Sequence, residues 1–188
     1  MNNINCYAKW TLRVAIICSL VFTLMTNYLV GTAGGTIVLA VTFVVDYINY
    51  KFFKINTTIT SMAYIYCIFS LVMGNMWNFY DKIEWWDILM HILSGIILGI
   101  IGDILLKNQM VDVRVHTKVQ FLFIVGIACI GGVIWEIYEF TVDSLLNLDM
   151  QLANVSGVTD TMWDLIADMS GGAGTGLFIS LLSKKSKK

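Results

Sequence analysis

The sequence contains no proline and very few charged residues. Only 13% of its 188 residues are Asp, Glu, Lys or Arg, whereas 57% are hydrophobic. A chain with so little charge is unlike a disordered segment. Its twelve basic and thirteen acidic residues balance to a formal charge of -1, so it lacks the basic excess that nucleic-acid binding requires. The composition therefore excludes both classes and indicates a membrane protein.

Cysteine is too widely spaced to build a metal site. The four cysteines include no C-x2-C pair, and Cys18, Cys67 and Cys129 fall inside apolar runs. Metal sites built from cysteine use closely spaced pairs. We therefore interpret these residues as small packing side chains.

Long apolar runs predict an all-α, polytopic integral membrane protein with six transmembrane helices. A hydrocarbon layer of about 30 Å needs roughly 20 apolar residues in helical form, whereas a membrane barrel shows alternating segments of about ten residues. We expect a single transmembrane domain over residues 1–188, with peripheral helices at about 12–77 and motif-bearing core helices at about 86–182. The six runs are residues 12–30, 32–52, 58–77, 88–106, 118–140 and 162–182.

The basic residues predict the orientation of these spans. An even number of spans puts both termini on one side, and eleven of the twelve Lys and Arg residues fall on that side. Because Lys and Arg concentrate in cytoplasmic loops, both termini are predicted to be cytoplasmic. Lys82 is the cation left on the outer side. The eleven inner cations are Lys9, Arg13, Lys51, Lys54, Lys107, Arg114, Lys118, Lys184, Lys185, Lys187 and Lys188.

Glycine divides the expected helices into two sets. Ten of the fifteen glycines lie in the last three spans, where Gly95 and Gly99, and also Gly172 and Gly176, are four residues apart. Small residues let helix backbones approach closely in lipid. We therefore expect spans four to six to form a tight core.

The same three spans carry acidic residues at helical spacing. The three sets are Asp87 with His91; Glu136, Glu139 and Asp143; and Asp160, Asp164 and Asp168. Within each set the residues are three or four positions apart, so each set projects from one face of its helix. His91, Glu136 and Asp168 lie 16 to 18 residues from the lysine at the inner end of their spans. At 1.5 Å per residue, this places the three at one level, about 24 to 27 Å from the inner boundary.

Carboxylates at this depth need a partner, because an ionised group in a membrane costs a few kcal/mol on insertion scales. Lys82 is the only outer cation, against seven carboxylates in these spans. Water, protonation or a bound cation are the remaining ways to hold them. Carboxylates combined with one imidazole suit a divalent metal cation, which we expect as the cofactor.

The acidic residues receive three expected roles. The candidate metal ligands are Asp87, His91, Glu136, Asp164 and Asp168. Glu139 is the candidate catalytic residue, as a proton acceptor beside the metal. The candidates for the second layer or rim of the site are Asp143, Asp160 and Asp81. Asp143 and Asp160 fit solvated interfacial charges equally well.

Three motifs in the second half of the chain resemble a known family. They are WDILMHILSG (residues 86–95), WEIYEF (135–140) and GVTDTMWDLIADM (157–169). On these motifs, the stretch from Tyr80 to about Gly176 resembles the YjdF-type family of predicted bacterial membrane proteins, which is itself similar to the VanZ-like superfamily. The last motif departs from the family pattern, because Ile166 and Ala167 stand where the family has Gln and Trp.

The resemblance implies a six-helix or similar fold in a bacterial plasma membrane, with the polar motifs gathered together. VanZ-like proteins are associated with resistance to glycopeptide antibiotics of the teicoplanin kind, which act on lipid-linked cell-wall precursors outside the membrane. The expected partners are therefore membrane lipids or lipid-linked head groups at the cell envelope. The site residues that it implies are Asp87, His91, Glu136, Glu139, Asp164 and Asp168.

Three functions remain open from the sequence. The first is a metal-dependent hydrolase or transferase that acts on an outer-leaflet lipid or lipid-linked head group. The second is a non-catalytic envelope-protection or lipid-binding protein of the VanZ-like kind. The third is an ion-coupled carrier, which we rank last because the sequence shows no broken helix pair and no internal repeat.

Overall fold

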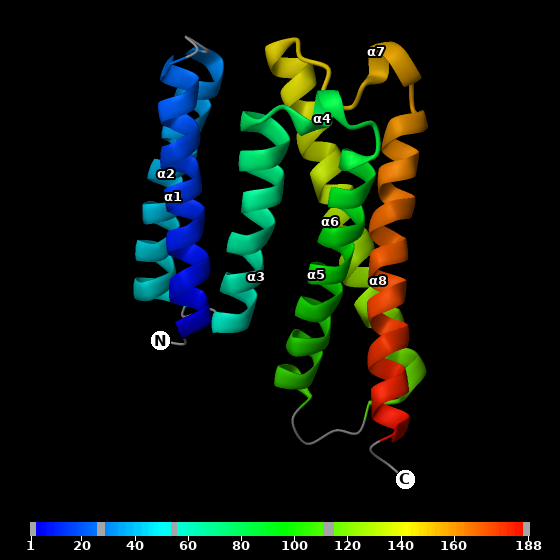
Figure 1. Cartoon of the computed structure of the whole chain (residues 1–188). Coiled ribbons are helices and arrows are strands. Elements are labelled where there is room, and N and C mark those ends of the chain that lie inside the picture. The colour runs from blue at the N-terminus through cyan, green and yellow to red at the C-terminus, as the bar shows by residue number, and fades with distance from the viewer. Residues whose placement is uncertain (1–2, 26–28, 54–55, 111–114, 186–188) are drawn as a thin grey trace. The chain divides into compact units, whose positions relative to one another are not determined.

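The computed structural model describes residues 3–25, 29–53, 56–110 and 115–185, and every regular element in these ranges is helical (Figure 1). The chain divides into two compact units, Met1–Trp86 and Asp87–Lys188, and each is described by itself. Long apolar runs form helices in lipid because a helix satisfies its backbone N–H and C=O groups internally. The all-α, polytopic fold class is therefore confirmed.

The first unit is built around three long helical segments. α2 continues directly into the π-helix η1, and α3 continues into the π-helix η2. Leu12 and Ile16 of α1 pack with Tyr64 of α3 and Val72 of η2 in its apolar core. The elements of this unit are α1 (Asn3–Met25), α2 (Leu29–Ile48), η1 (Asn49–Phe53), α3 (Thr57–Cys67), η2 (Ile68–Met76) and α4 (Phe79–Lys82).

A buried charge network joins α1 to α2 and α3. Arg13 is only 3% exposed, and it pairs with Asp46 at 2.7 Å while donating to both oxygens of Thr42 at 3.1 Å. Lys9 lies 3.2 Å from the same carboxylate, and the Tyr64 hydroxyl donates to its other oxygen. Because every charge in this network has a partner of opposite sign and further hydrogen bonds, its burial is tolerated.

The long helices among the described residues of the second unit run side by side (Figure 1). A Cβ atom on Gly95 would collide with the backbone carbonyl of Asp168, and one on Gly171 would collide with that of Ile92. Glycine therefore lets the backbones of the first and last of these helices touch, as expected for a tight core. The elements are α5 (Trp86–Gln109), α6 (Thr117–Leu146), α7 (Ala153–Ser156) and α8 (Thr159–Lys185).

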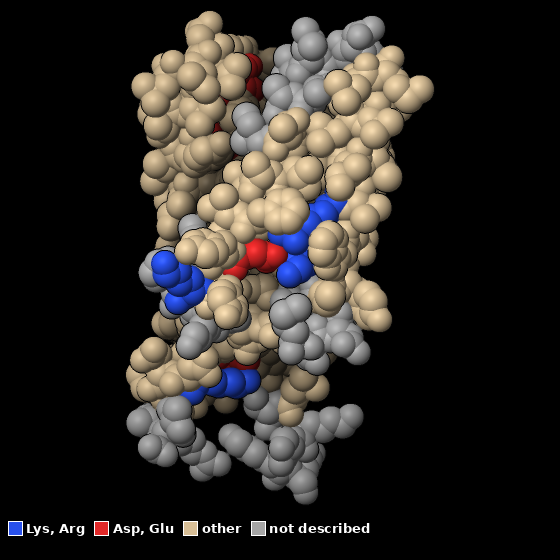
Figure 2. Space-filling view, turned by 90° about the vertical axis from the view of Figure 1, so that its left-hand side faces the viewer, with Lys and Arg blue, Asp and Glu red and all other residues tan. Residues whose placement is uncertain are grey.

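Five helices in the described residues are long and apolar enough to cross a membrane: Cys6–Met25, Thr57–Met76, Trp86–Gln109, Thr117–Leu146 and Thr159–Leu182. The face drawn in Figure 2 is dominated by uncharged side chains, as contact with lipid requires. The remaining expected span, 32–52, which is the second along the chain, falls within α2 and η1. It is not among these five, so the count of six remains a prediction.

Two details differ from the sequence expectations or fall outside the described ranges. The first expected span, 12–30, is too long at its end, because α1 stops at Met25 and Val30 already belongs to α2. Leu29 and Val30 are apolar, so hydropathy alone extends the first expected span to them. Residues 26–28 lie outside the described ranges, and so do four of the cations that the sequence predicts on the inner side: Lys54, Arg114, Lys187 and Lys188.

Candidate metal centre

The alternating direction of the three core helices places their polar motifs at one end of the second unit. α5 and α8 both run antiparallel to α6, so the first turns of α5 and α8 lie beside the last turns of α6 (Figure 1). The first motif forms the start of α5, the second lies in the second half of α6, and the third includes the first turns of α8. Three segments that are distant in the sequence therefore deliver polar side chains to the same level.

Asp87, His91 and Asp164 come together as a group of three possible metal ligands. His91 Nε2 lies 3.8 Å from Asp87 Oδ1 and 3.8 Å from Asp164 Oδ1. One ligand atom from each of the three residues lies within 4.8 Å of the others. Ligand atoms around one metal ion approach it to about 2.0–2.6 Å, so they stand roughly 3–5 Å apart. The observed separations fall in this range.

Asp168 occupies the opposite side of the histidine ring. Its Oδ2 lies 2.9 Å from His91 Nδ1, and the Ser94 hydroxyl hydrogen-bonds to its Oδ1. Asp168 is 1% exposed, and its carboxylate lies against Gly132 of α6, where a Cβ atom would be 2.5 Å from Oδ2. A carboxylate that holds one ring nitrogen of a histidine turns the other nitrogen toward a metal. Asp168 is thus placed to orient His91.

Asp164 has a buried oxygen without a donor. The side chain is 2% exposed, and its Oδ1 has no hydrogen-bond partner among the described residues. The ion pairs described at this site join its carboxylates only to His91. A buried carboxylate oxygen without a donor is costly unless a cation binds it. This oxygen therefore points to a ligand.

Asp103, at the other end of the same unit, shows how a buried carboxylate is ordinarily held. It is 7% exposed, and it accepts from Lys107 at 2.5 Å and from Gln120 at 2.7 Å. Lys107 lies on the same helix and Gln120 on α6, so both oxygens of Asp103 have donors. The contrast with Asp164 shows that the unpaired carboxylate is a feature of the polar end and not of the whole unit.

Glu136 and Glu139 border the group of three from α6, and both are buried. Gln151 Nε2 donates to Glu136 Oε2 at 3.0 Å, whereas Glu136 Oε1 is buried and has no partner in the described part of the chain. Trp135 Nε1 donates to Glu139 Oε1 at 3.0 Å. Glu136 lies near enough to Asp164, and Glu139 near enough to Asp87 and His91, for their charges to interact.

The expected rim residues take three different positions. Asp143 accepts the backbone N–H groups of Met150 and Gln151 at 2.8 and 3.1 Å, so it holds the α6–α8 connection. Asp160 lies one turn before Asp164, and its Oδ2 is buried without a described partner. Asp81 is exposed on α4 and belongs to the other compact unit.

Two polar residues at the site were not proposed from the sequence. Ser94 lies three positions after His91, so its helical spacing could have indicated a shared face. Gln151 sits in a connection without periodicity, and no local signal could have linked it to Glu136. Only the folded path of the connection brings the two together.

Comparison with known proteins gives a family and one relative. A family model described as a predicted membrane protein family (DUF2238) matches residues 8–185. An uncharacterized protein of Thermotoga maritima is 39% identical over 101 residues, which are 53% of this chain and 50% of that protein. The alignment thus spans about half the length of the relative. No solved structure matches the chain.

Proposed function

The chain belongs to the DUF2238 family of predicted membrane proteins, and from this premise we propose that it binds a divalent metal cation through Asp87, His91 and Asp164. We further propose that the site hydrolyses or transfers the head group of an outer-leaflet lipid or lipid-linked molecule in a bacterial plasma membrane. Metal binding is the first step of this proposal and is tested before the chemistry.

One observation carries the proposal: Asp164 Oδ1 is buried with no hydrogen-bond donor among the residues that the structure describes, and it lies 3.8 Å from His91 Nε2. A mixed set of two carboxylates and one imidazole is the donor chemistry of Zn²⁺ and Mn²⁺ sites. Three protein ligands leave coordination positions open for water or substrate, as catalytic sites require. The residues present therefore fit a divalent ion.

The chain's own residues supply the other parts of a hydrolytic site. Asp168 holds His91 Nδ1, which keeps Nε2 available as a ligand. Glu139 has one oxygen bonded to Trp135, which leaves the other to take a proton from an attacking water and return it to the departing oxygen. A bound divalent ion would polarise the phosphoryl or acyl oxygen under attack.

The location of the site favours an amphiphilic substrate. Its residues lie at one end of three helices that are long enough to span a membrane, and exposed Trp135 and Trp163 stand at the same end. Tryptophan concentrates at the membrane–water interface. A lipid could present its head group at this level while its chains stay in the hydrocarbon. The orientation predicted from the basic residues makes this the outer leaflet.

Metal content tests the first step. The protein is purified in detergent and dialysed against Zn²⁺ or Mn²⁺, and bound metal is measured by mass spectrometry and titration calorimetry. We expect one ion per chain in the wild type and none in Asp164→Asn, because loss of the carboxylate charge removes a ligand. Asp103→Asn is the matched control and should keep its ion. Equal metal content in the wild type and Asp164→Asn would overturn the metal site.

Turnover tests the chemistry. Phospholipids and polyprenyl diphosphates are presented in mixed micelles, and released phosphate or head group is measured with and without added metal. We expect metal-dependent release that falls at least 100-fold in Glu139→Gln while metal content is unchanged. Metal binding without release from either class of lipid would reject the enzyme and leave a binding protein.

A non-catalytic role is the second candidate. The motifs resemble the YjdF-type family, which is itself similar to the VanZ-like superfamily, and this resemblance favours the second candidate. In this role the cation would recruit an anionic head group and so protect the envelope. An ion-coupled carrier is less favoured, because the inner-end carboxylates Asp46 and Asp103 are both ion-paired and offer no free acid for a proton path.

A further inference from the structure

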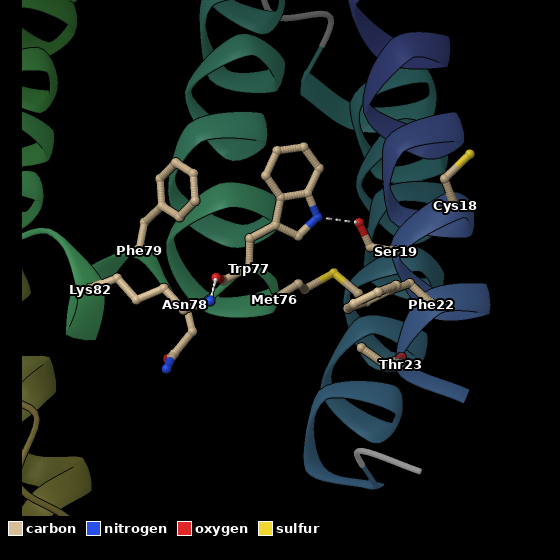
Figure 3. Close-up of a pocket in the computed structure, with 9 residues that line it drawn as sticks. All are labelled: Cys18, Ser19, Phe22, Thr23, Met76, Trp77, Asn78, Phe79 and Lys82. Atoms are coloured by element: carbon tan, nitrogen blue, oxygen red, sulfur yellow. Dashed lines mark hydrogen bonds between the residues drawn. The ribbon is translucent and has the colours of Figure 1, made fainter. Parts of the chain in front are cut away.

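A cavity of about 730 Å³ lies in the first unit, beside the outer part of α1 and the turn from η2 into α4 (Figure 3). Sites for small ligands commonly measure about 300–1,000 Å³. Nothing in the metal chemistry proposed above involves this cavity. Its lining residues are Cys18, Ser19, Phe22, Thr23, Met76, Trp77, Asn78, Phe79 and Lys82.

The walls of the cavity are apolar and partly fixed. Trp77 Nε1 donates to Ser19 Oγ at 3.0 Å, which ties the turn to α1 and sets the plane of the indole. Phe79 packs near this indole, with ring centroids 6.0 Å apart. Met76 is 9% exposed, whereas Phe22 is 60% exposed and leaves the cavity open at one side. An open apolar cavity in a membrane protein is accessible to a lipid chain.

Lys82 supplies the one cation of the cavity. Its Nζ donates to the backbone carbonyl of Trp77 at 2.9 Å, which holds the ammonium at the turn from η2 into α4 (Figure 3). An ammonium has three donors, and no ion pair in the described residues joins Lys82 to a carboxylate. Two N–H groups therefore remain for an anionic ligand.

The position of the cavity along the helices matches the head-group level of a bilayer. The candidate spans Cys6–Met25 and Thr57–Met76 both end beside it, and Trp77 follows the second span directly. Lysine and tryptophan at the end of a span face the zone where lipid phosphates lie. We propose that the cavity binds a phospholipid with an anionic head group, whose acyl chain lies against Trp77 and Phe22 and whose phosphate accepts hydrogen bonds from Lys82.

Native mass spectrometry of the full chain tests this site. The protein is titrated in detergent with phosphatidylglycerol or phosphatidylcholine of identical chains, and bound lipid is counted. One lysine near a membrane surface favours an anionic lipid by about fivefold. We expect the wild type to prefer phosphatidylglycerol by about this factor, and Lys82→Gln to bind both lipids equally.

Two further variants separate the site from general lipid adhesion. Cys18→Phe places a larger side chain in the cavity and should lower the binding of both lipids. Lys51 lies outside the cavity and hydrogen-bonds to Tyr47, so Lys51→Gln should leave the preference for phosphatidylglycerol unchanged. A preference that survives Lys82→Gln, or that is lost in Lys51→Gln, would overturn the proposal. So would unchanged binding in a folded Cys18→Phe protein. Metal content should be the same in all these variants, which distinguishes this site from the metal centre.

Discussion

His91 uses its two ring nitrogens for different partners, and this division gives the surrounding carboxylates different roles. Nδ1 lies 2.9 Å from Asp168, within hydrogen-bond distance, whereas Nε2 lies 3.8 Å from both Asp87 and Asp164. Two groups that share a direct hydrogen bond have no room for an ion between them, whereas two groups 3.8 Å apart can both contact one ion. Asp168, which the sequence presents as one more ligand, is therefore better suited to orient the histidine.

Replacing Asp168 by Asn should weaken metal binding without abolishing it. The amide cannot hold the imidazole as strongly as the carboxylate does, and partners of this kind typically contribute 10- to 100-fold in metal affinity. Titration calorimetry with Zn²⁺ should show this decrease for Asp168→Asn and complete loss for Asp164→Asn. If the two substitutions had the same effect, Asp168 would be a direct ligand.

At the scale of helices, glycine determines how closely α5 and α8 pack. Gly171 faces the backbone carbonyl of Ile92, whereas a Cβ atom on Gly174, in the same helix, would meet nothing within 4 Å. Backbone cannot move aside as a flexible side chain can. The two positions therefore respond differently to an added methyl group.

Gly171→Ala should destabilise the second unit, because overpacking typically costs about 1–3 kcal/mol. Gly174→Ala should be neutral or stabilising, because alanine is favoured over glycine in a helix by about 1 kcal/mol. Thermal unfolding in detergent should show a melting temperature lowered by several degrees in Gly171→Ala only. Equal melting temperatures in the two variants would show that α5 and α8 do not touch at Gly171.

Side-chain hydrogen bonds hold the connection between α6 and α8 in place, so the contribution of one of these side chains can be tested by substitution. Asp143 accepts hydrogen bonds from two backbone N–H groups of the connection, those of Met150 and Gln151. The Gln151 side chain donates to the Glu136 carboxylate. Asn147 ends α6 in the left-handed conformation, with φ of 55°. Asparagine tolerates this conformation, so it can turn the chain back toward the site.

Asp143→Ala should release this connection. Hydrogen bonds to a charged acceptor contribute about 1.5–3 kcal/mol, and each 1.4 kcal/mol corresponds to a factor of ten in opening. Hydrogen exchange at the amides of Met150 and Gln151 should accelerate at least tenfold, measured by mass spectrometry of peptides. Peptides from α5 should exchange as in the wild type. Unchanged exchange at both amides would show that Asp143 does not hold the connection.

At the scale of the whole molecule, the distribution of basic residues predicts which ends of the helices face the cytoplasm. Single cysteines introduced into a background without the four native ones can test this. Val155, between α6 and α8, is 83% exposed, and Met110, between α5 and α6, is 44% exposed. A membrane-impermeant maleimide should label Val155→Cys in intact cells and Met110→Cys only after lysis. The reverse pattern would invert the orientation.

The class of the protein and the location of its polar segments could be predicted from the sequence. Long unbroken apolar runs form helices in lipid because a helix satisfies its backbone groups within one segment, whereas barrel strands show alternating hydrophobicity, so the all-α architecture follows from hydropathy. Helical spacing places Asp87 and His91 on one face of a helix, and it does the same for Asp164 and Asp168. These inferences are local, since each depends on a single helix.

Only the tertiary structure decided which of these residues meet and through which atoms. The rotation and axial offset of α5 against α8 depend on contacts between the two helices, such as that of Gly95 with the backbone of Asp168. The spacing of residues along one helix does not predict these contacts. Asp164 and Asp168 are about one helical turn apart, so a shift of α8 by one turn would exchange the carboxylates that face His91. Packing between helices therefore places Asp164 near Nε2 of His91 and Asp168 at Nδ1. It also brings Gln151 to Glu136. Residue spacing within one helix does not determine this packing.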